Sequence, residues 1–405
     1  MHFTPDPVGD LYFNGVASGV DRTLYSAGIQ GDGSLGLGAA HTLRSGFTLL
    51  DESVSADSTT TVFPVDGDGD PTGPVFPIAD RERLSALFAG GYLQDEWKIT
   101  RELTMNYGAR LDVFDASFDR ESQLSPRVNF IDRLTDSTTV HAGYSRYFTP
   151  PPVENVPGST VAQFNGTSNA SGTDLDDPVR AERADYFDAG LSQKLGTGLQ
   201  VGLDGYYKRA KNQLDDGLFG QTLILSAFNY AKGEIYGLEL TGSCTRGDFS
   251  TYLNLAHSVA KGEDWSSAQF LFNPTELAYV KDHWIFLDHD QALTGSFGAS
   301  YVWKKVGGDT RVYVDTIYGT GLRTDSTAPD GSIIPNGGTV PEYYTASVGA
   351  ERSFRIDANR DWKIRLDIVN VTDNSYELRD GSGVGVNAAQ YGMRRGIFGS
   401  VSYAY

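Results

Sequence analysis

The stretch LTMNYGARLDV, Leu103–Val113, decides the fold class. Apolar residues occupy every second position in it, and small or polar residues occupy the others. The apolar set is Leu103, Met105, Tyr107, Ala109, Leu111 and Val113, and the alternate set is Thr104, Asn106, Gly108, Arg110 and Asp112. This alternation predicts a β-strand with one apolar and one polar face. A strand of about ten residues is also long enough to cross a bilayer at a tilt.

The same alternation recurs along the chain. Leu199, Val201 and Leu203 face opposite to Gln200 and Asp204. Two further rows are Leu293, Phe297, Ala299, Tyr301 and Trp303, and Ile364, Leu366 and Ile368 opposite Lys363, Arg365 and Asp367. In a soluble sandwich the apolar face would form a core, whereas in a membrane barrel it meets lipid and the polar face lines a wet lumen. Strands of globular proteins are typically shorter, so the length favours a barrel.

The composition favours an all-β protein. The 405 residues include 22 Tyr, 21 Phe and 47 Gly, which favour strands and turns. No run of eighteen apolar residues is visible, so a helical membrane protein is excluded. The net charge of −19 argues against nucleic-acid binding, which needs a basic surface. Cys244 is the single cysteine, so an intrachain disulfide is excluded.

The connections between the predicted strands alternate between short and long. Short links fall near 99–102, 134–137, 194–197, 245–247, 304–309 and 355–361, and longer ones near 54–83, 116–122, 149–181, 261–288, 323–340 and 374–393. Outer-membrane barrels have short periplasmic turns and long outer loops. The pattern predicts an antiparallel transmembrane β-barrel of about 16 strands, the first of them weakly marked near residues 9–19. An even count would place both termini on the periplasmic side.

Several segments together resemble the barrel of TonB-dependent outer-membrane receptors. They are GGYLQDEWKITRELTMNYGARLDVFD (Gly90–Asp115), LSPRVNF (Leu124–Phe130), TVHAGYSRYFTPP (Thr139–Pro151), ERADYFDAGL (Glu182–Leu191), AKGEIYGLEL (Ala231–Leu240), IRLDIVNVTDNSYEL (Ile364–Leu378) and RRGIFGSVSYAY (Arg394–Tyr405). They occur in the family's order and with its spacing. Residues 84–405 are similar throughout and residues 20–83 loosely, so residues 1–405 are interpreted as one barrel domain, with 1–83 weakly matched.

The resemblance implies an outer-membrane receptor of a Gram-negative bacterium that takes up a scarce bulky nutrient such as a ferric siderophore. Its implied partners are outer-membrane lipid and lipopolysaccharide, the barrel-assembly machinery, the small-molecule ligand and, in an intact parent, the TonB energy-transducing complex. Family members have an N-terminal plug domain inside a 22-stranded barrel. Nothing in this sequence resembles the plug, and Met1–Thr4 does not resemble a secretion signal, so a trimmed or truncated chain is expected.

The last strand carries an aromatic ending by which, the resemblance implies, the family's barrels are recognised for assembly. Its residues that share one face are Ile397, Val401, Tyr403 and Tyr405. In physical terms, an aromatic side chain at the bilayer interface anchors the strand.

One long loop is richer in aromatic residues than a solvated segment needs. The candidate ligand-binding residues in it are Trp265, Phe270, Phe272, His283, Trp284 and Phe286. Such side chains can stack on a ligand or cover the barrel mouth, and some of them could equally belong to the outer aromatic belt.

Acidic loops offer candidate cation sites. Asp66, Asp68 and Asp70 have the spacing of calcium ligands, but the closing Glu of a complete calcium loop is missing, and an acidic solvated loop is the favoured interpretation. The same holds for the acidic run Asp174, Asp176 and Asp177. In the aromatic loop, His283 and His289 accompany Asp282, Asp288 and Asp290. Such a group could contact an iron-bearing ligand or bind a transition metal, but a polar loop or an interface anchor is the favoured interpretation. No metal or cofactor is assigned.

The sequence also bears on three alternatives to the receptor: an enzyme, a passive pore and a secreted β-propeller. No nucleophile, phosphate-loop or dinucleotide motif is visible, so an enzyme is not expected. A passive, plugless pore closed by about 16 strands is the alternative to the receptor. A secreted β-propeller would need repeats of about forty residues, and none is found.

Overall fold

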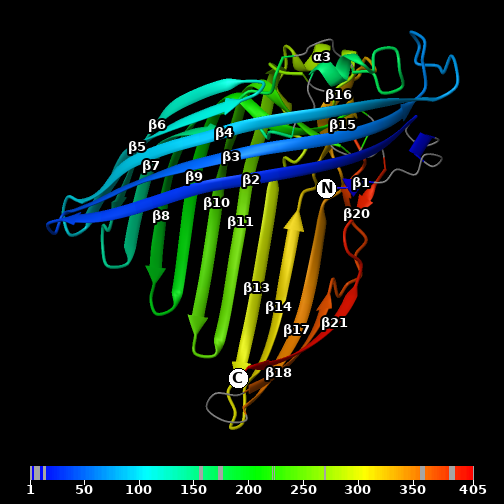
Figure 1. Ribbon diagram of the computed structural model, residues 1–405. Coiled ribbons are helices and arrows are strands. Elements are labelled where there is room, and N and C mark those ends of the chain that lie inside the picture. Colours follow the sequence, from blue (N-terminus) through cyan, green and yellow to red (C-terminus); the bar gives the residue numbers. More distant parts are fainter. Residues whose placement is uncertain are drawn as a thin grey trace.

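The computed structural model describes residues 2–3, 10–11, 15–154, 158–171, 177–220, 222, 224–268, 271–355, 361–382 and 388–404, and these residues are mostly in strands (Figure 1). A 17-stranded antiparallel sheet dominates the structure. Two of its members, β1 (His2–Phe3) and β12 (Ile285–Phe286), are dipeptides, which leaves fifteen long strands. These are β2 (Val16–Leu37), β3 (His41–Val62), β4 (Phe76–Lys98), β5 (Leu103–Ala116), β6 (Arg120–Asp132), β7 (Thr138–Thr149), β8 (Glu182–Leu195), β9 (Leu199–Leu218), β10 (Leu225–Arg246), β11 (Phe249–Trp265), β13 (Leu293–Trp303), β14 (Thr310–Gly319), β17 (Tyr343–Arg355), β18 (Asp361–Val369) and β21 (Gly396–Ala404).

Each long strand pairs with the next long strand along the chain, so the sheet is a continuous up-and-down meander. Two small hairpins lie outside it, β15 (Arg323–Thr327) with β16 (Ile333–Thr339) and β19 (Glu377–Arg379) with β20 (Gln390–Tyr391). The described parts of the connections include the short helices α2 (Gly158–Ala162) and α3 (Pro274–Val280). No helix in the described part of the chain is long and apolar enough to cross a membrane.

The two faces of the sheet differ as the alternation predicts. On one face, called the outer face, large apolar side chains are exposed, among them Leu93, Leu111, Leu203, Leu238, Phe297, Leu366 and Val401. The long loops pack against the opposite, inner face, where Val20 and Val54 are buried beneath them. An apolar face that is not buried by protein matches a surface made for lipid, so the expected orientation is confirmed.

The number of strands differs from the prediction by one. The expected weak strand near residues 9–19 does not form a separate long strand in the described residues, because Val16 already begins β2. With fifteen strands, the chain enters the sheet at the loop-bearing end and leaves it at the opposite end (Figure 1). The expectation that both termini lie on the same side is therefore wrong. In the described residues β2 and β21 do not pair with each other, so the sheet is open.

Short turns join the strands at one end and longer connections at the other, as predicted. The described short turns are 38–40, 99–102, 133–137, 196–198, 247–248 and 304–309, and the longest connections at the other end are 63–75, 150–181, 266–292, 320–342 and 370–395. Two predicted loops are wrong in extent. The loop predicted near 54–83 comprises only residues 63–75, and the one predicted near 116–122 comprises only 117–119. A hydrogen bond from the Ala116 amide to the Asp119 carbonyl closes the second loop.

A repeated three-strand contact braces the inner face. Tyr252 lies over Gly298 of the neighbouring strand and donates its hydroxyl to Asp315 on the strand beyond, at 3.0 Å. The same arrangement links Tyr92, Gly46 and Asp32, and also Tyr313, Gly349 and Asp367. The glycine leaves room for the ring, so each contact ties three consecutive strands together.

The final strand presents its predicted apolar row. Ile397 and Val401 are exposed on the outer face, and the Tyr403 ring packs against Trp362 of β18 with centroids 5.0 Å apart. Tyr405 lies outside the described residues. An outward row with aromatic residues at the turn end is the geometry of a membrane-interface strand, and its role in assembly stays a prediction.

Candidate functional site

The connections at the loop end fold back onto the inner face and build small apolar clusters there. The largest joins the β11–β13 connection to β10 and β11, through Phe228, Tyr230, Ala260, Phe272, Leu277, Val280, Ile285 and Leu287. A second packs residues around α2 and the β9–β10 connection against β2 and β3, and a third seats Val153 beside Val54 and Phe114. Apolar contacts therefore hold these connections against the sheet.

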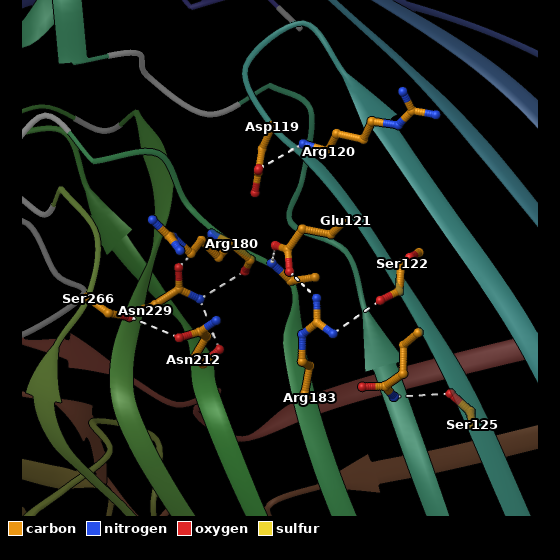
Figure 2. A network of polar contacts seen from close by, with 12 residues as sticks. Asp119, Arg120, Glu121, Ser122, Ser125, Arg180, Arg183, Asn212, Asn229 and Ser266 are labelled. Carbon is orange, nitrogen blue, oxygen red and sulfur yellow. Dashed lines mark hydrogen bonds and ion pairs between the residues drawn. The ribbon is translucent and has the colours of Figure 1, made fainter.

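Asn229 on β10 is the polar hub of this region (Figure 2). Its side-chain oxygen accepts the Arg180 amide at 2.7 Å, and its amide donates to the carbonyls of Arg180 and Asn212. The backbone amide of Asn229 donates to the Ser267 hydroxyl at 2.9 Å. The side chain is fully buried. One residue thus joins the end of the β7–β8 connection to the start of the β11–β13 connection.

A second set of contacts fastens the entrance of β8 (Figure 2). Glu121 accepts the Ala181 amide and the Arg183 guanidinium, which also donates to the Ser122 carbonyl. Glu182 pairs with Lys208 of β9. These half-buried, charge-assisted bonds connect β6, β8 and β9 where the strands leave the apolar band.

Below the connections, three tyrosines form a row on the inner face. The ring of Tyr147 (β7) meets Tyr186 (β8) edge-on at 5.8 Å, and Tyr186 stacks on Tyr206 (β9) at 6.3 Å. Tyr147 is about half exposed. The next residue on β9, Tyr207, points to the outer face and is exposed. The row therefore offers aromatic surface and hydroxyl groups to the interior.

A cavity of about 390 Å³ adjoins the first of these tyrosines. Besides Tyr147, its wall contains Arg110 and Arg127, with Asp112 and Ser125 beside them. Arg110 is paired with Asp112, whereas Arg127 lies over the Tyr92 ring at 5.8 Å. Guanidinium groups beside aromatic rings suit an anionic, aromatic or chelated ligand.

The predicted aromatic loop does not form a single binding face. Trp265 packs partly buried against the largest cluster, and Phe272 is buried inside it. His283 is exposed and stacks on Tyr279, and Trp284 is exposed beside it. Phe286 lies under Arg323, whose guanidinium carbon is 3.4 Å from the ring centroid. Phe270 lies outside the described residues. The structure thus separates core residues from surface residues, and a ligand role for the set stays a prediction.

Two carboxylates and one imidazole converge at the loop-bearing end of β9. The lipid-facing apolar row of this strand ends at Tyr207, so Asp215 lies beyond the apolar band. The Nδ1 atom of His289 lies 2.9 Å from a carboxylate oxygen of Asp288 and 3.6 Å from one of Asp215. The three ligating atoms lie within 4.8 Å of one another. Both carboxylates are buried, whereas the imidazole is exposed.

Cations and a tyrosine surround this cluster. Arg379 contacts the other oxygen of Asp288 at 2.6 Å, and Arg323 pairs with the buried Asp290. Burial raises the pKa of Asp215 to about 7, against the opposing effect of His289. The bond to Asp288 raises the pKa of His289. Burial also raises the pKa of Tyr230 well above its usual value, and Asp215 and Asp288 add to this. Buried acidic groups and their cationic partners are therefore gathered at this point.

The sequence pattern found part of this cluster and missed the rest. The spacing within one loop drew attention to Asp288, Asp290 and His289, but His283 and Asp282 are not part of the group. Asp215 and Tyr230 lie on other strands, and only the fold brings them there. The Asp66 carboxylate instead accepts the amides of its own turn, and in the described residues Asp66, Asp68 and Asp70 do not converge. Asp174 and Asp176 lie outside the described residues, whereas Asp177 is described and exposed.

Comparison with protein families gives one match that covers most of the chain. Residues 4–371 match the family model described as TonB dependent receptor-like, beta-barrel. An iron-regulated outer membrane virulence protein of Vibrio cholerae serotype O1 is 23% identical over 221 residues, which cover 51% of this chain and 33% of the relative.

Solved structures share the same fold. The ferripyoverdine receptor of the outer membrane of Pseudomonas aeruginosa is 15% identical, with a TM-score of 0.63 over 96% of this chain and 50% of the receptor. The ferric yersiniabactin uptake receptor of Yersinia pestis is 14% identical, with a TM-score of 0.65 over 96% of this chain and 55% of the receptor. The chain thus spans about half the length of these solved receptors.

Proposed function

The chain belongs to the TonB-dependent receptor-like β-barrels of the bacterial outer membrane, and on that premise we propose that it forms part of a receptor for a ferric siderophore. The ligand enters from the loop end and contacts the tyrosine row Tyr147, Tyr186 and Tyr206. Arg127 supplies positive charge beside this row. Uptake in this proposal is driven by the TonB complex, which acts on the longer receptor.

The observation that carries the proposal is the inner face below the loops. Siderophores that bind iron through catecholates or hydroxamates are bulky, polar and frequently anionic. A row of tyrosines with an adjacent arginine offers stacking surface, hydroxyl donors and charge to such a chelate. The relatives support iron as the cargo. One is named an iron-regulated outer membrane virulence protein, and two similar structures are a ferripyoverdine receptor and a ferric yersiniabactin uptake receptor.

The remaining partners follow from the same premise. The exposed apolar outer face is proposed to contact lipid, with lipopolysaccharide in the outer leaflet. The row of Ile397, Val401 and Tyr403 on β21 is proposed to be recognised by the barrel-assembly machinery. The exposed residues of the aromatic loop, His283 and Trp284, are proposed to meet the ligand first.

The test is binding of iron chelates to the purified chain in detergent. A panel of iron(III) catecholate and iron(III) hydroxamate complexes is titrated while tryptophan fluorescence is recorded. We expect saturable quenching by at least one class. Tyr206→Ala and Arg127→Ala are each expected to weaken that binding about tenfold, as when one stacking or charge-assisted contact is lost.

A matched control lies on the same strand. Tyr207 is next to Tyr206 but points to the outer face, so Tyr207→Ala should leave the affinity unchanged. Equal losses in the two variants, or no binding by any chelate, would overturn the proposal. Liposomes that contain the chain provide a second readout, since a passive pore would admit uncharged sugars of every tested stereochemistry at equal rates.

A further inference from the structure

The cluster at the loop-bearing end of β9 has the geometry of a transition-metal site. In a tetrahedral zinc site, ligand atoms about 2.0–2.2 Å from the ion lie roughly 3.3–3.5 Å from one another. The Nδ1 atom of His289 is 2.9 Å from the Asp288 oxygen and 3.6 Å from the Asp215 oxygen. The three ligand atoms lie within 4.8 Å of one another, so shifts of up to about 1 Å would place all of them around one ion.

A separate observation also points to a missing ligand. The hydroxyl of Tyr230 is fully buried and has no hydrogen-bond partner among the described residues. Tyr230 packs in the same buried cluster as Leu287, the neighbour of Asp288, and pairs across the sheet with Gln213, two residues before Asp215. A buried hydroxyl without a partner costs free energy of folding unless something binds it. An ion between the carboxylates would give it an acceptor, either directly or through a bound water.

We propose that Asp215, Asp288 and His289 bind a divalent first-row transition metal such as Zn²⁺, with Tyr230 beside the fourth position. One imidazole and two carboxylates suit such an ion better than Ca²⁺ or Mg²⁺, which take oxygen ligands. The exposed imidazole gives the ion a path from solvent. Arg379 orients Asp288 through the oxygen that does not face His289.

The ion would fasten the β11–β13 connection to β9. His289 and Asp288 precede β13, whereas Asp215 belongs to the loop-bearing end of β9. In the sheet β9 is separated from β13 by β10 and β11. Other links are already present, since Asp290 accepts the Ala260 amide at 2.7 Å and pairs with Arg323. A metal would add a direct bond from β9, so we infer that it holds this connection against the inner face. This inference does not depend on the siderophore proposal.

The experiment uses the full chain in detergent, stripped with a chelator and titrated with ZnCl₂ alone. We expect one Zn²⁺ per chain by equilibrium dialysis. His289→Ala and Asp215→Asn should each weaken binding at least a hundredfold, and Tyr230→Phe about tenfold. Replacement by Co²⁺ should give the visible absorption of a tetrahedral site, and Zn²⁺ should slow hydrogen exchange of the amides in 285–292.

His283→Ala is the matched control. This imidazole lies in the same connection and is also exposed, but it stacks on Tyr279 away from the cluster, so its loss should not change the affinity. The His289 side chain is half exposed, so its replacement should leave the fold intact. Absence of stoichiometric Zn²⁺ in the unaltered chain, or an equal loss in His283→Ala and His289→Ala, would show the inference to be wrong.

Discussion

At the scale of single residues, Asn229 is the side chain on which two long connections depend. Its amide group makes three hydrogen bonds in a fully buried position. We predict that Asn229→Ala lowers the free energy of local opening by about 2–4 kcal/mol, because the amide of Arg180 and the carbonyls of Arg180 and Asn212 would be left without partners. Hydrogen exchange at the Ser266 amide measures this free energy, because its acceptor is the backbone carbonyl of Asn229, which the variant keeps.

Two further variants separate hydrogen bonding from volume. Asn229→Asp keeps the shape but cannot donate, so it should destabilise at least as much as Asn229→Ala. Ser266→Ala removes only one bond of 3.3 Å to Asn212 and should cost less than about 1 kcal/mol. A large effect of Ser266→Ala together with a small one of Asn229→Asp would contradict the assignment of Asn229 as the hub.

Asp373, in the connection after β18, predicts a pH dependence. Two bonds from Arg394 and one from the Arg395 amide lower the pKa of this carboxyl to about 2. Because the pKa in the folded state lies below the unfolded value of about 3.9, the stabilisation is complete above roughly pH 5. It is lost as the pH falls towards 2. The protection of the Arg395 amide, which is its intrinsic exchange rate divided by the observed rate, should fall as the pH is lowered from 6 to 2.

The control for this prediction is Asp373→Asn, which cannot ionise. Its Arg395 amide should exchange faster than that of the unaltered chain at pH 6, and the difference should vanish near pH 2. A constant difference over the whole range would mean that the carboxylate charge has no role in this turn.

At the scale of strands, the Tyr–Gly–Asp contacts predict which glycines matter. A Cβ at Gly298 would collide with the Tyr252 ring and with Asp315. We predict that Gly298→Ala lowers the free energy of unfolding by about 1–3 kcal/mol, since the ring must leave its position and loses its bond to Asp315. Urea unfolding in lipid vesicles, followed by tryptophan fluorescence, measures the change.

Gly33→Ala is the comparison within a strand, because a Cβ there meets nothing within 4 Å. It should be neutral, or slightly stabilising through its higher strand propensity. The double variant Tyr252→Ala/Gly298→Ala tests the mechanism, because removal of the ring should remove most of the cost of the alanine. A full additive loss in the double variant would exclude the collision as the cause.

Strands were predictable from the sequence where one face meets lipid, and less so beyond the bilayer. The Leu103–Val113 alternation located β5 because each residue is either outward or inward within the apolar band. β3 runs on through Ser53–Thr61, where Val54 and Ala56 are the only apolar residues, so the sequence there shows no sustained apolar row. The prediction of a loop there was wrong for this reason. Glycines at 28, 31, 33 and 36 similarly suggest turns, although Gly31 only leaves room for the Phe47 ring.

At the scale of the whole molecule, sequence order explains which parts of the candidate site were foreseen. Asp288 and His289 are adjacent in the sequence, whereas Asp215 and Tyr230 join them only through the pairing of β9, β10 and β11. The tyrosine row is likewise assembled by strand pairing, because Tyr147, Tyr186 and Tyr206 come from three different strands. A site assembled from one residue per strand leaves no local spacing in the sequence, so only the register of the sheet reveals it.

The odd number of long strands predicts how the sheet behaves at its edges. In an antiparallel meander of fifteen strands, β2 and β21 run in the same direction, so direct closure would need a parallel seam. Bacterial outer-membrane barrels are antiparallel throughout and have even strand numbers. We therefore expect that these edges do not join in the isolated chain. In a Cys244→Ser background, the pairs Leu35→Cys/Val401→Cys and Ile29→Cys/Ile397→Cys should form no intrachain disulfide.

The positive control is Ile29→Cys/Leu49→Cys, which lies on paired positions of β2 and β3 and should crosslink on oxidation. Free edges also expose unpaired backbone groups, so crosslinks between copies should appear in the edge variants as the protein concentration rises. A disulfide within one chain at either edge pair, formed as readily as in the control, would mean that fifteen strands close with a parallel seam. In that case the receptor's interior would be enclosed by this chain alone, and the passive-pore alternative would regain support.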